Sequence, residues 1–203
     1  MTLEVAVFAA ATALVATLDP LSLAAHQIAL NTASLTFMVP LGISSAAAVR
    51  VGHALGRQDV AGAARAGWTA MLLGVAFMSL AAIAMLTAPE YIARIYTTDR
   101  AIIRTTVALL AVAAAFQLFD GIQIVATGAL RGAGDTRTPM VCHMVCYWFF
   151  GLPLGYALCF GLGWGAVGLW AGLCVALISI GCVLLVAWRR KVRTFAAHAA
   201  SVS

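Results

Sequence analysis

Six long apolar segments constrain this chain more than any other feature. They run near residues 3–18, 23–48, 67–88, 104–128, 139–160 and 166–188, between charged clusters or glycine and proline breaks. Roughly 20 apolar residues in a helix cross the hydrocarbon core of a bilayer. The segments are rich in alanine and leucine and lack the polar–apolar alternation of membrane strands. The sequence therefore predicts an all-α integral membrane protein with a bundle of six transmembrane helices.

Composition excludes a water-soluble domain of this size. Of the 203 residues, 64% are hydrophobic and only 9% are charged, whereas soluble domains are near half apolar and a quarter charged. We expect the lipid bilayer as the partner and no nucleic acid. All five cysteines lie in apolar segments, where they act as small apolar residues and form no disulfide framework.

The distribution of basic residues predicts the orientation of the bundle. Nine of the twelve basic residues gather on one side: Arg50, Arg57, Arg65, Arg131, Arg137, Arg189, Arg190, Lys191 and Arg193. The positive-inside rule places that side in the cytoplasm. We expect residues 1–190 to form the bundle and residues 191–203 to form a basic cytoplasmic tail. The protein is then expected in a bacterial inner membrane with both chain ends in the cytoplasm. The connection at 49–66 is then a solvated surface loop or a hinge-like element.

Asp120 is the most informative polar residue. It lies 16 residues after Arg104 and 11 before Arg131, near the bilayer midplane. A carboxylate at this depth costs at least ~2.5 kcal/mol, which indicates a function. Gln117, Gln123 and Thr127 share one third of the helical wheel with Asp120, so we expect this stripe to face a cavity or another helix.

Glu4 is the second candidate. It precedes the turn at Asp19 by 15 residues, which gives it nearly the depth of Asp120 if both helices reach the outer face. The alternative is a glutamate near the chain end in the headgroup zone. The depth argument implies that the chain begins inside a helix whose cytoplasmic part is missing.

The second segment carries another polar stripe, formed by Gln27, Asn31 and Ser34 at spacings that share one helical face. Two interpretations stay open. The amides hydrogen-bond between helices, or the stripe lines a cavity.

Other motifs predict structure and no chemistry. Cys142, His143 and Cys146 fall within about one helical turn but have no evident fourth ligand, so we expect no metal site. Three glycine pairs spaced by four residues predict close helix packing: Gly151/Gly155, Gly161/Gly165 and Gly168/Gly172. Pro40 and Pro153 are expected to bend their helices.

Three stretches resemble a known family. They are AAHQIALN at 24–31, FMVPLGISSAAAVRVGHALG at 37–56 and QLFDGIQIVATGALRGAGDTRTP at 117–139. These residues resemble the second half of a multidrug and toxic compound extrusion (MATE) transporter of the NorM-like branch, over about residues 2–190. The resemblance implies one six-helix lobe of a twelve-helix, two-lobe transporter that exports organic, often cationic or amphipathic compounds against inward Na⁺ or H⁺.

The same resemblance implies that Asp120 and Glu4 form the site for the coupling cation or proton. It implies no enzymatic activity and no cofactor besides that ion. The first lobe is absent, so it is expected either in the same polypeptide or as a second copy of this chain. Two alternatives remain: a non-transporting fragment or assembly module, and a lipid-linked flippase of the same superfamily. A flippase needs a strongly basic cavity, whereas the intramembrane ionisable residues here are acidic.

Overall fold

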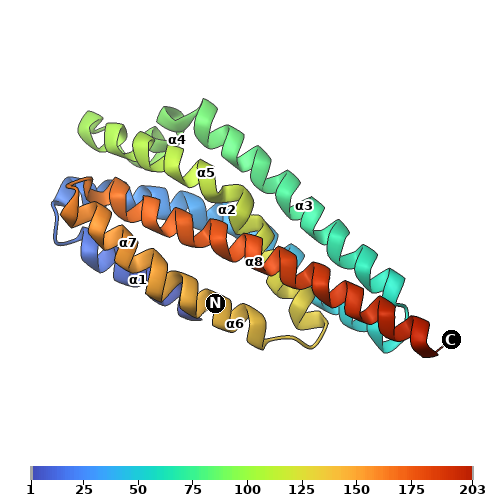
Figure 1. Cartoon of the computed structure of the whole chain (residues 1–203). Coiled ribbons are helices and arrows are strands. Elements are labelled where there is room, and N and C mark those ends of the chain that lie inside the picture. The colour runs from blue at the N-terminus through green and yellow to red at the C-terminus, as the bar shows by residue number, and fades with distance from the viewer. Residues whose placement is uncertain (1, 203) are drawn as a thin grey trace.

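The computed structural model describes the backbone of residues 2–202 and the side chains of residues 5–195 and 197. Every regular element in this part of the chain is helical (Figure 1). The elements are α1 (Thr2–Val15), α2 (Pro20–Gly56), α3 (Val60–Thr87), α4 (Pro89–Tyr96), α5 (Arg100–Gly132), α6 (Arg137–Met144), η1 (Val145–Gly151), α7 (Leu152–Tyr156), η2 (Ala157–Gly161) and α8 (Gly165–Val202). The predicted fold class, a bundle of apolar helices, is confirmed.

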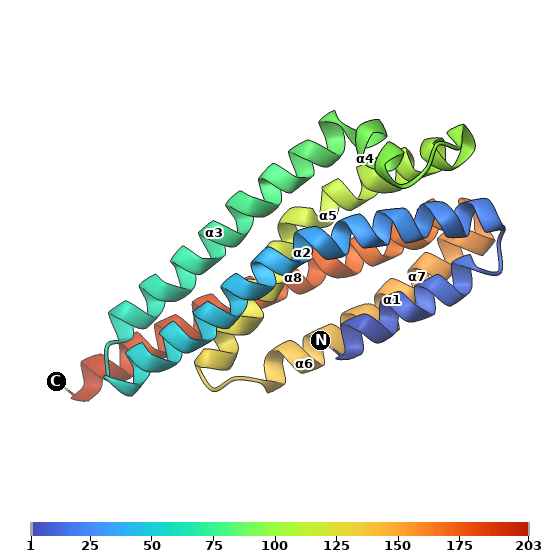
Figure 2. The same cartoon turned by 180° about the vertical axis from the view of Figure 1, so that it is seen from behind.

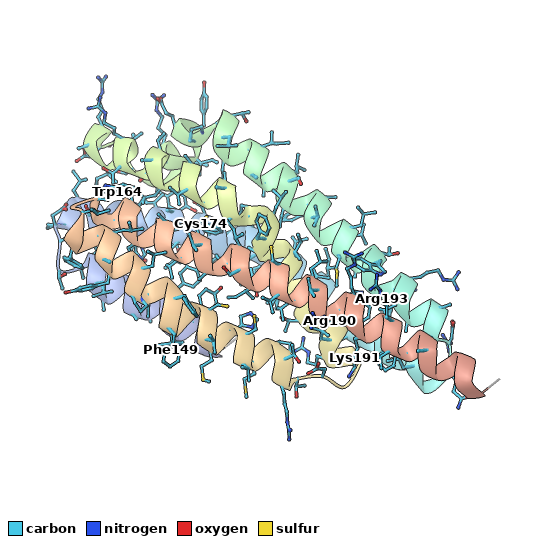
Figure 3. All side chains as sticks on the ribbon, in the orientation of Figure 1. Phe149, Trp164, Cys174, Arg190, Lys191 and Arg193 are labelled. Carbon is cyan, nitrogen blue, oxygen red and sulfur yellow. The ribbon has the colours of Figure 1, made fainter. Side chains whose placement is uncertain are left out.

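Five of the described segments are long and apolar enough to cross a membrane: α2, α3, α5, the continuous stretch 137–161, and α8 up to Phe195. The apolar part of α1, Val5–Val15, is shorter. Large apolar side chains cover the outside of the bundle, and Phe149, labelled in Figure 3, is 68% exposed. This surface suits a lipid environment, where no water penalises exposed apolar groups.

The helices extend well past the predicted apolar segments. The prediction of an 18-residue connection at 49–66 is wrong, because α2 continues to Gly56 and α3 begins at Val60. Likewise α8 continues through the predicted tail, and the short helix α4 lies within the predicted connection between the third and fourth segments. An apolar run ends where the membrane ends, whereas the backbone hydrogen bonds of a helix continue into water.

Aspartates begin three of the long helices. The carboxylates of Asp19, Asp59 and Asp99 accept hydrogen bonds from backbone N–H groups two or three residues later, at 2.7–2.8 Å. Such N-caps satisfy donors that have no partner inside the helix. The hydrogen bonds from Ser22 hold the pKa of the Asp19 carboxyl below its usual value.

The centre of the bundle is α5, which packs against α2, α3 and α8. At its crossing with α2, a Cβ on Gly128 would lie 2.2 Å from the Ser44 carbonyl oxygen, and one on Gly132 would lie 2.4 Å from that of Ala48. Only glycine permits this approach. It also allows the Ser44 hydroxyl to donate to the Ile124 carbonyl at 2.7 Å.

On the opposite side of the bundle, α1 runs beside the segment that begins with α6 and includes α7 (Figures 1 and 2). In Figure 2, α2 changes direction along its length, as expected for a helix with Pro40 in its interior. Pro153 lies in α7 between the two π-helical segments η1 and η2. Proline removes a backbone donor, which explains why the regular α-helical pattern is interrupted here.

Two predicted glycine pairs do make close helix contacts. A Cβ on Gly172 would lie 2.3 Å from the Gly155 nitrogen, and one on Gly151 would lie 2.8 Å from the Ala176 Cβ. The prediction for Gly161/Gly165 is wrong. Neither meets a neighbour within 4 Å, and Gly165 has a φ of +58°, so this pair belongs to the turn before α8.

Candidate functional site

Five of the seven acidic residues have structural partners at helix ends. Besides the three capping aspartates, Asp135 accepts hydrogen bonds from both the backbone N–H and the hydroxyl of Thr138, at 3.0 and 2.8 Å. Glu90 forms an exposed salt bridge with Arg94 at 3.1 Å. Asp120 and Glu4, the two predicted site residues, are the acidic residues that remain.

Asp120 lies in the middle of α5 and is 7% exposed. It borders a cavity of about 410 Å³ between α1, α2 and α5. The described lining is otherwise apolar except for two hydroxyls: Val5, Phe8, Ala9, Thr12, Leu30, Ala33, Ser34, Phe37, Met38, Leu41 and Phe116. Within the described lining, the Asp120 carboxylate therefore faces an apolar and aromatic space.

Gln123 connects Asp120 to the next helix. Its Nε2 donates to the Asp120 carboxylate at 3.0 Å, and its Oε1 lies 2.5 Å from His143 Nε2. The other ring nitrogen, His143 Nδ1, lies 2.6 Å from the Pro139 carbonyl oxygen. All three side chains are buried, with exposed fractions of 0–8%. This hydrogen-bonded series joins α5 to α6.

The donor and acceptor roles in this series depend on the tautomer of His143 and on which way the Gln123 amide is turned. His143 Nδ1 faces the Pro139 carbonyl oxygen, and Nε2 faces the Gln123 side chain. In each assignment Gln123 lies between Asp120 and His143 and connects them.

Gln117 extends the polar stripe toward α2. Its Nε2 donates to the Thr36 hydroxyl at 2.8 Å, while its buried Oε1 has no hydrogen-bond partner among the described residues. Thr127, the last member of the predicted stripe, donates to the Gln123 carbonyl at 2.8 Å. Gln117, Asp120 and Gln123 are buried between helices, and of the stripe only Asp120 is among the described lining residues of the cavity, so a cavity-lining role for Gln117, Gln123 and Thr127 stays a prediction.

A second polar series holds the α1 wall of the cavity. Trp170 Nε1 donates to His26 Nδ1 at 2.9 Å, so His26 carries its proton on Nε2 and donates to Thr12 Oγ1, also at 2.9 Å. Thr12 in turn donates to the Phe8 carbonyl. The series connects α8, α2 and α1 through two fully buried rings. Sequence reasoning missed it, although a histidine inside an apolar segment was a signal.

The remaining predicted residues lie in different surroundings. Of the stripe on α2, Ser34 lines the cavity, whereas Gln27 and Asn31 are exposed on the outside of the described bundle. The side chain of Glu4 lies outside the described residues. Its neighbour Val5 lines the same cavity as Asp120, but the pairing of the two acids stays a prediction.

The cysteine–histidine cluster on α6 and η1 has other contacts. The sulfurs of Cys142 and Cys146 lie 4.0 Å apart, and all five cysteines are reduced. His143 uses both ring nitrogens in the series described above. No group of three metal-binding side chains occurs among the described residues.

The fold and this site define a helical membrane protein with a carboxylate at the wall of a cavity between its helices, an arrangement found in transporters. The family model MatE matches residues 1–157. The chain therefore belongs to the MatE family of multidrug efflux transporters.

The relatives are NorM proteins. The chain is 42% identical to the probable multidrug resistance protein NorM of Brucella suis biovar 1, over 98% of this chain and 43% of that protein. It is 46% identical to the multidrug resistance protein NorM of Burkholderia vietnamiensis, over 94% and 42%. The fold is similar to that of the eukaryotic MATE transporter AtDTX14, with a TM-score of 0.84 and 21% identity, over 93% of this chain and 44% of that one. The chain thus spans less than half the length of these relatives.

Proposed function

We propose that this chain provides one lobe of a cation-coupled antiporter that exports organic cations. The buried carboxylate of Asp120 at the wall of an apolar cavity is the observation on which this proposal depends. A charged acid inside a membrane is costly, so its retention requires a partner of opposite charge or a proton. The names of the NorM relatives support the same assignment.

The lining of the cavity favours an amphipathic, cationic substrate. Phe8, Phe37 and Phe116 supply aromatic surface, and Asp120 supplies the negative charge. Aromatic faces attract organic cations, and a carboxylate fixes their position. A lipid-linked flippase fits less well, since the described lining contains no arginine, lysine or histidine.

Coupling follows from competition for Asp120. When H⁺ or Na⁺ occupies the carboxylate, together with Glu4 as we expect, the charge that holds the substrate is neutralised and the substrate leaves. Rocking of the two lobes against each other then exposes the site to the other side. Gln123 holds the Asp120 carboxylate beside the cavity by a 3.0 Å hydrogen bond, so that the coupling ion and the substrate meet the same group.

Dye binding to the purified chain in lipid nanodiscs tests the assignment. We expect ethidium to bind with enhanced fluorescence and Asp120→Asn to abolish binding while the helix content is kept. Glu90→Gln removes an exposed carboxylate away from the cavity and serves as the matched control. Equal binding by Asp120→Asn and the native chain contradicts the proposal.

The coupling ion is distinguished in the same assay. Ethidium affinity is measured against pH at constant Na⁺, and against Na⁺ at constant pH. If ethidium affinity falls in only one of these two titrations, the ion varied in that titration is the coupling ion. Dye export by the two-lobe protein, with and without Asp120→Asn, separates a transporter from a non-transporting module.

We also propose that the basic end of the bundle faces the cytoplasm of a bacterial inner membrane. Arg190, Lys191 and Arg193 lie near the end opposite Trp164, in keeping with the positive-inside rule (Figure 3). The α2–α3 and α5–α6 connections lie at that basic end too (Figure 1). A reporter enzyme that is active only outside the cytoplasm, fused after residue 58 or residue 98, should be active only in the second position.

A further inference from the structure

A second cavity, unrelated to the Asp120 site, lies between the end of α2 and the beginning of α3. Its volume is about 770 Å³. Its lining residues come from α2, α3 and the turn between them, and Figure 2 shows these two helices meeting at one end of the bundle. Nothing in the proposed transport cycle uses it.

Three arginines line this cavity. Arg50 and Arg57 lie seven residues apart on one face of α2, and Arg65 contributes to the lining from α3. None of the three forms a salt bridge in the described part of the chain. Asp59 is the one carboxylate in the lining, and it also accepts a hydrogen bond from the Gly62 N–H as the N-cap of α3. The lining therefore has a surplus of positive charge.

The rest of the cavity is mainly apolar, with His53 and Thr69 as its other polar side chains, and it extends along both helices. Ile43 lies seven residues before Arg50, about 10 Å deeper in the bilayer, and Leu73 lies eight residues after Arg65, about 12 Å deeper. Alanines line the walls between these two levels. Leu73 is 56% exposed, so the cavity opens sideways to the acyl chains of the surrounding lipid.

We propose that this cavity binds one anionic phospholipid, such as phosphatidylglycerol, from the surrounding bilayer. The phosphate lies between Arg50, Arg57 and Arg65, which offer bidentate hydrogen bonds that suit phosphate oxygens. An acyl chain follows the apolar walls toward Ile43 and Leu73. Basic pockets between transmembrane helices are recognised sites for anionic headgroups. The lipid then contacts both α2 and α3 at the end of the bundle where the three residues Arg57–Asp59 form the turn between the two helices.

Thermal unfolding of the detergent-purified chain, titrated with defined lipids, tests the proposal. We expect phosphatidylglycerol to raise the midpoint saturably, and phosphatidylcholine, inorganic phosphate and glycerophosphoglycerol to have no such effect. Stabilisation by either phosphate compound alone shows a site for a free anion and overturns the lipid assignment. Equal stabilisation by the two phospholipids overturns it as well.

Two substitutions with opposite effects strengthen the test. Arg50→Gln should weaken the apparent affinity for phosphatidylglycerol about tenfold, because a charge-assisted hydrogen bond is lost. Asp59→Asn should tighten it, because it removes the only negative charge of the lining while asparagine still caps α3.

Arg137→Gln is the matched control, since Arg137 is a basic residue at the same end of the bundle that does not line the cavity. Circular dichroism verifies the fold of each variant. If Arg137→Gln weakens binding as much as Arg50→Gln, or if Asp59→Asn weakens it, the lipid is held by the general charge of this end and the proposed site is refuted.

Discussion

Gly128→Ala is a direct test of how α5 is positioned. The added Cβ would lie 2.2 Å from the carbonyl oxygen of Ser44 and 2.4 Å from its hydroxyl oxygen. Carbon–oxygen contacts between helices are normally about 3.3–3.6 Å long. The obstacle is backbone, which has no rotamer to change, so α2 and α5 must separate by about 1 Å at the crossing. Asp120 lies two turns away on the same helix and moves with it.

The cost follows from three contributions. Overpacking of a tight interface costs about 1–3 kcal/mol. Separation of the helices lengthens the 2.7 Å bond from the Ser44 hydroxyl to the Ile124 carbonyl, worth ~0.6 kcal/mol inside a membrane. Against this, alanine is a better helix former than glycine by about 1 kcal/mol. We expect a net destabilisation of about 0.6–2.6 kcal/mol.

The measurement is unfolding of the purified chain by sodium dodecyl sulfate in mixed micelles, followed by far-ultraviolet circular dichroism. Gly42→Ala is the control, because Gly42 lies inside α2 and an added Cβ there would meet nothing within 4 Å. It gains the same helix propensity without the clash, so it should unfold no earlier than the native chain. If both variants unfold together, the close crossing of α2 and α5 does not exist as described.

Further predictions use the same unfolding assay. His143→Leu removes the buried contact between His143 Nε2 and Gln123 Oε1 and should cost about 1–3 kcal/mol. Trp170→Phe removes the donor to His26 Nδ1 but keeps an aromatic ring, and should cost about 1 kcal/mol. For Asp135, partial burial raises the carboxyl pKa, but the hydrogen bonds from Thr138 outweigh it and lower the pKa below the ordinary 3.8. Its stabilisation is thus present above pH 3.8 and lost as the pH falls through the lower folded value, and Asp135→Asn should flatten this acid dependence below pH 3.8.

Hydrophobicity predicted the fold class but not the ends of the helices. Transfer of apolar residues into lipid decides which segments cross, so the runs of alanine and leucine were sufficient for the bundle. Helix ends depend instead on caps and turns. Arg57 is the C-cap of α2 and Asp59 is the N-cap of α3. Both lie within residues 49–66, a polar stretch of 18 residues that hydrophobicity alone predicted as one loop.

The site was predicted in part for a similar reason. Asp120 could be identified from the sequence alone, because a charged residue in the middle of an apolar segment is energetically costly wherever its neighbours lie. A helical wheel shows that Gln27 and Asn31 share a face but not which neighbour that face meets, and in this chain it is exposed. The contact of His26 with Trp170 joins residues 144 positions apart, and no local pattern contains that information.

The walls of the Asp120 cavity differ in how firmly they are held. On one side, the close contact of Gly128 with Ser44 locks α5 against α2, and packed interfaces of this kind resist small displacements. On the other side, α1 has 14 residues, and among the described side chains the Thr12–His26–Trp170 series joins it by hydrogen bonds to α2 and α8. We therefore expect a ligand that fills the cavity to displace α1 before it separates α2 from α5. Such a displacement should strain the hydrogen bond between Thr12 and His26, and through His26 and Trp170 it should reach α8.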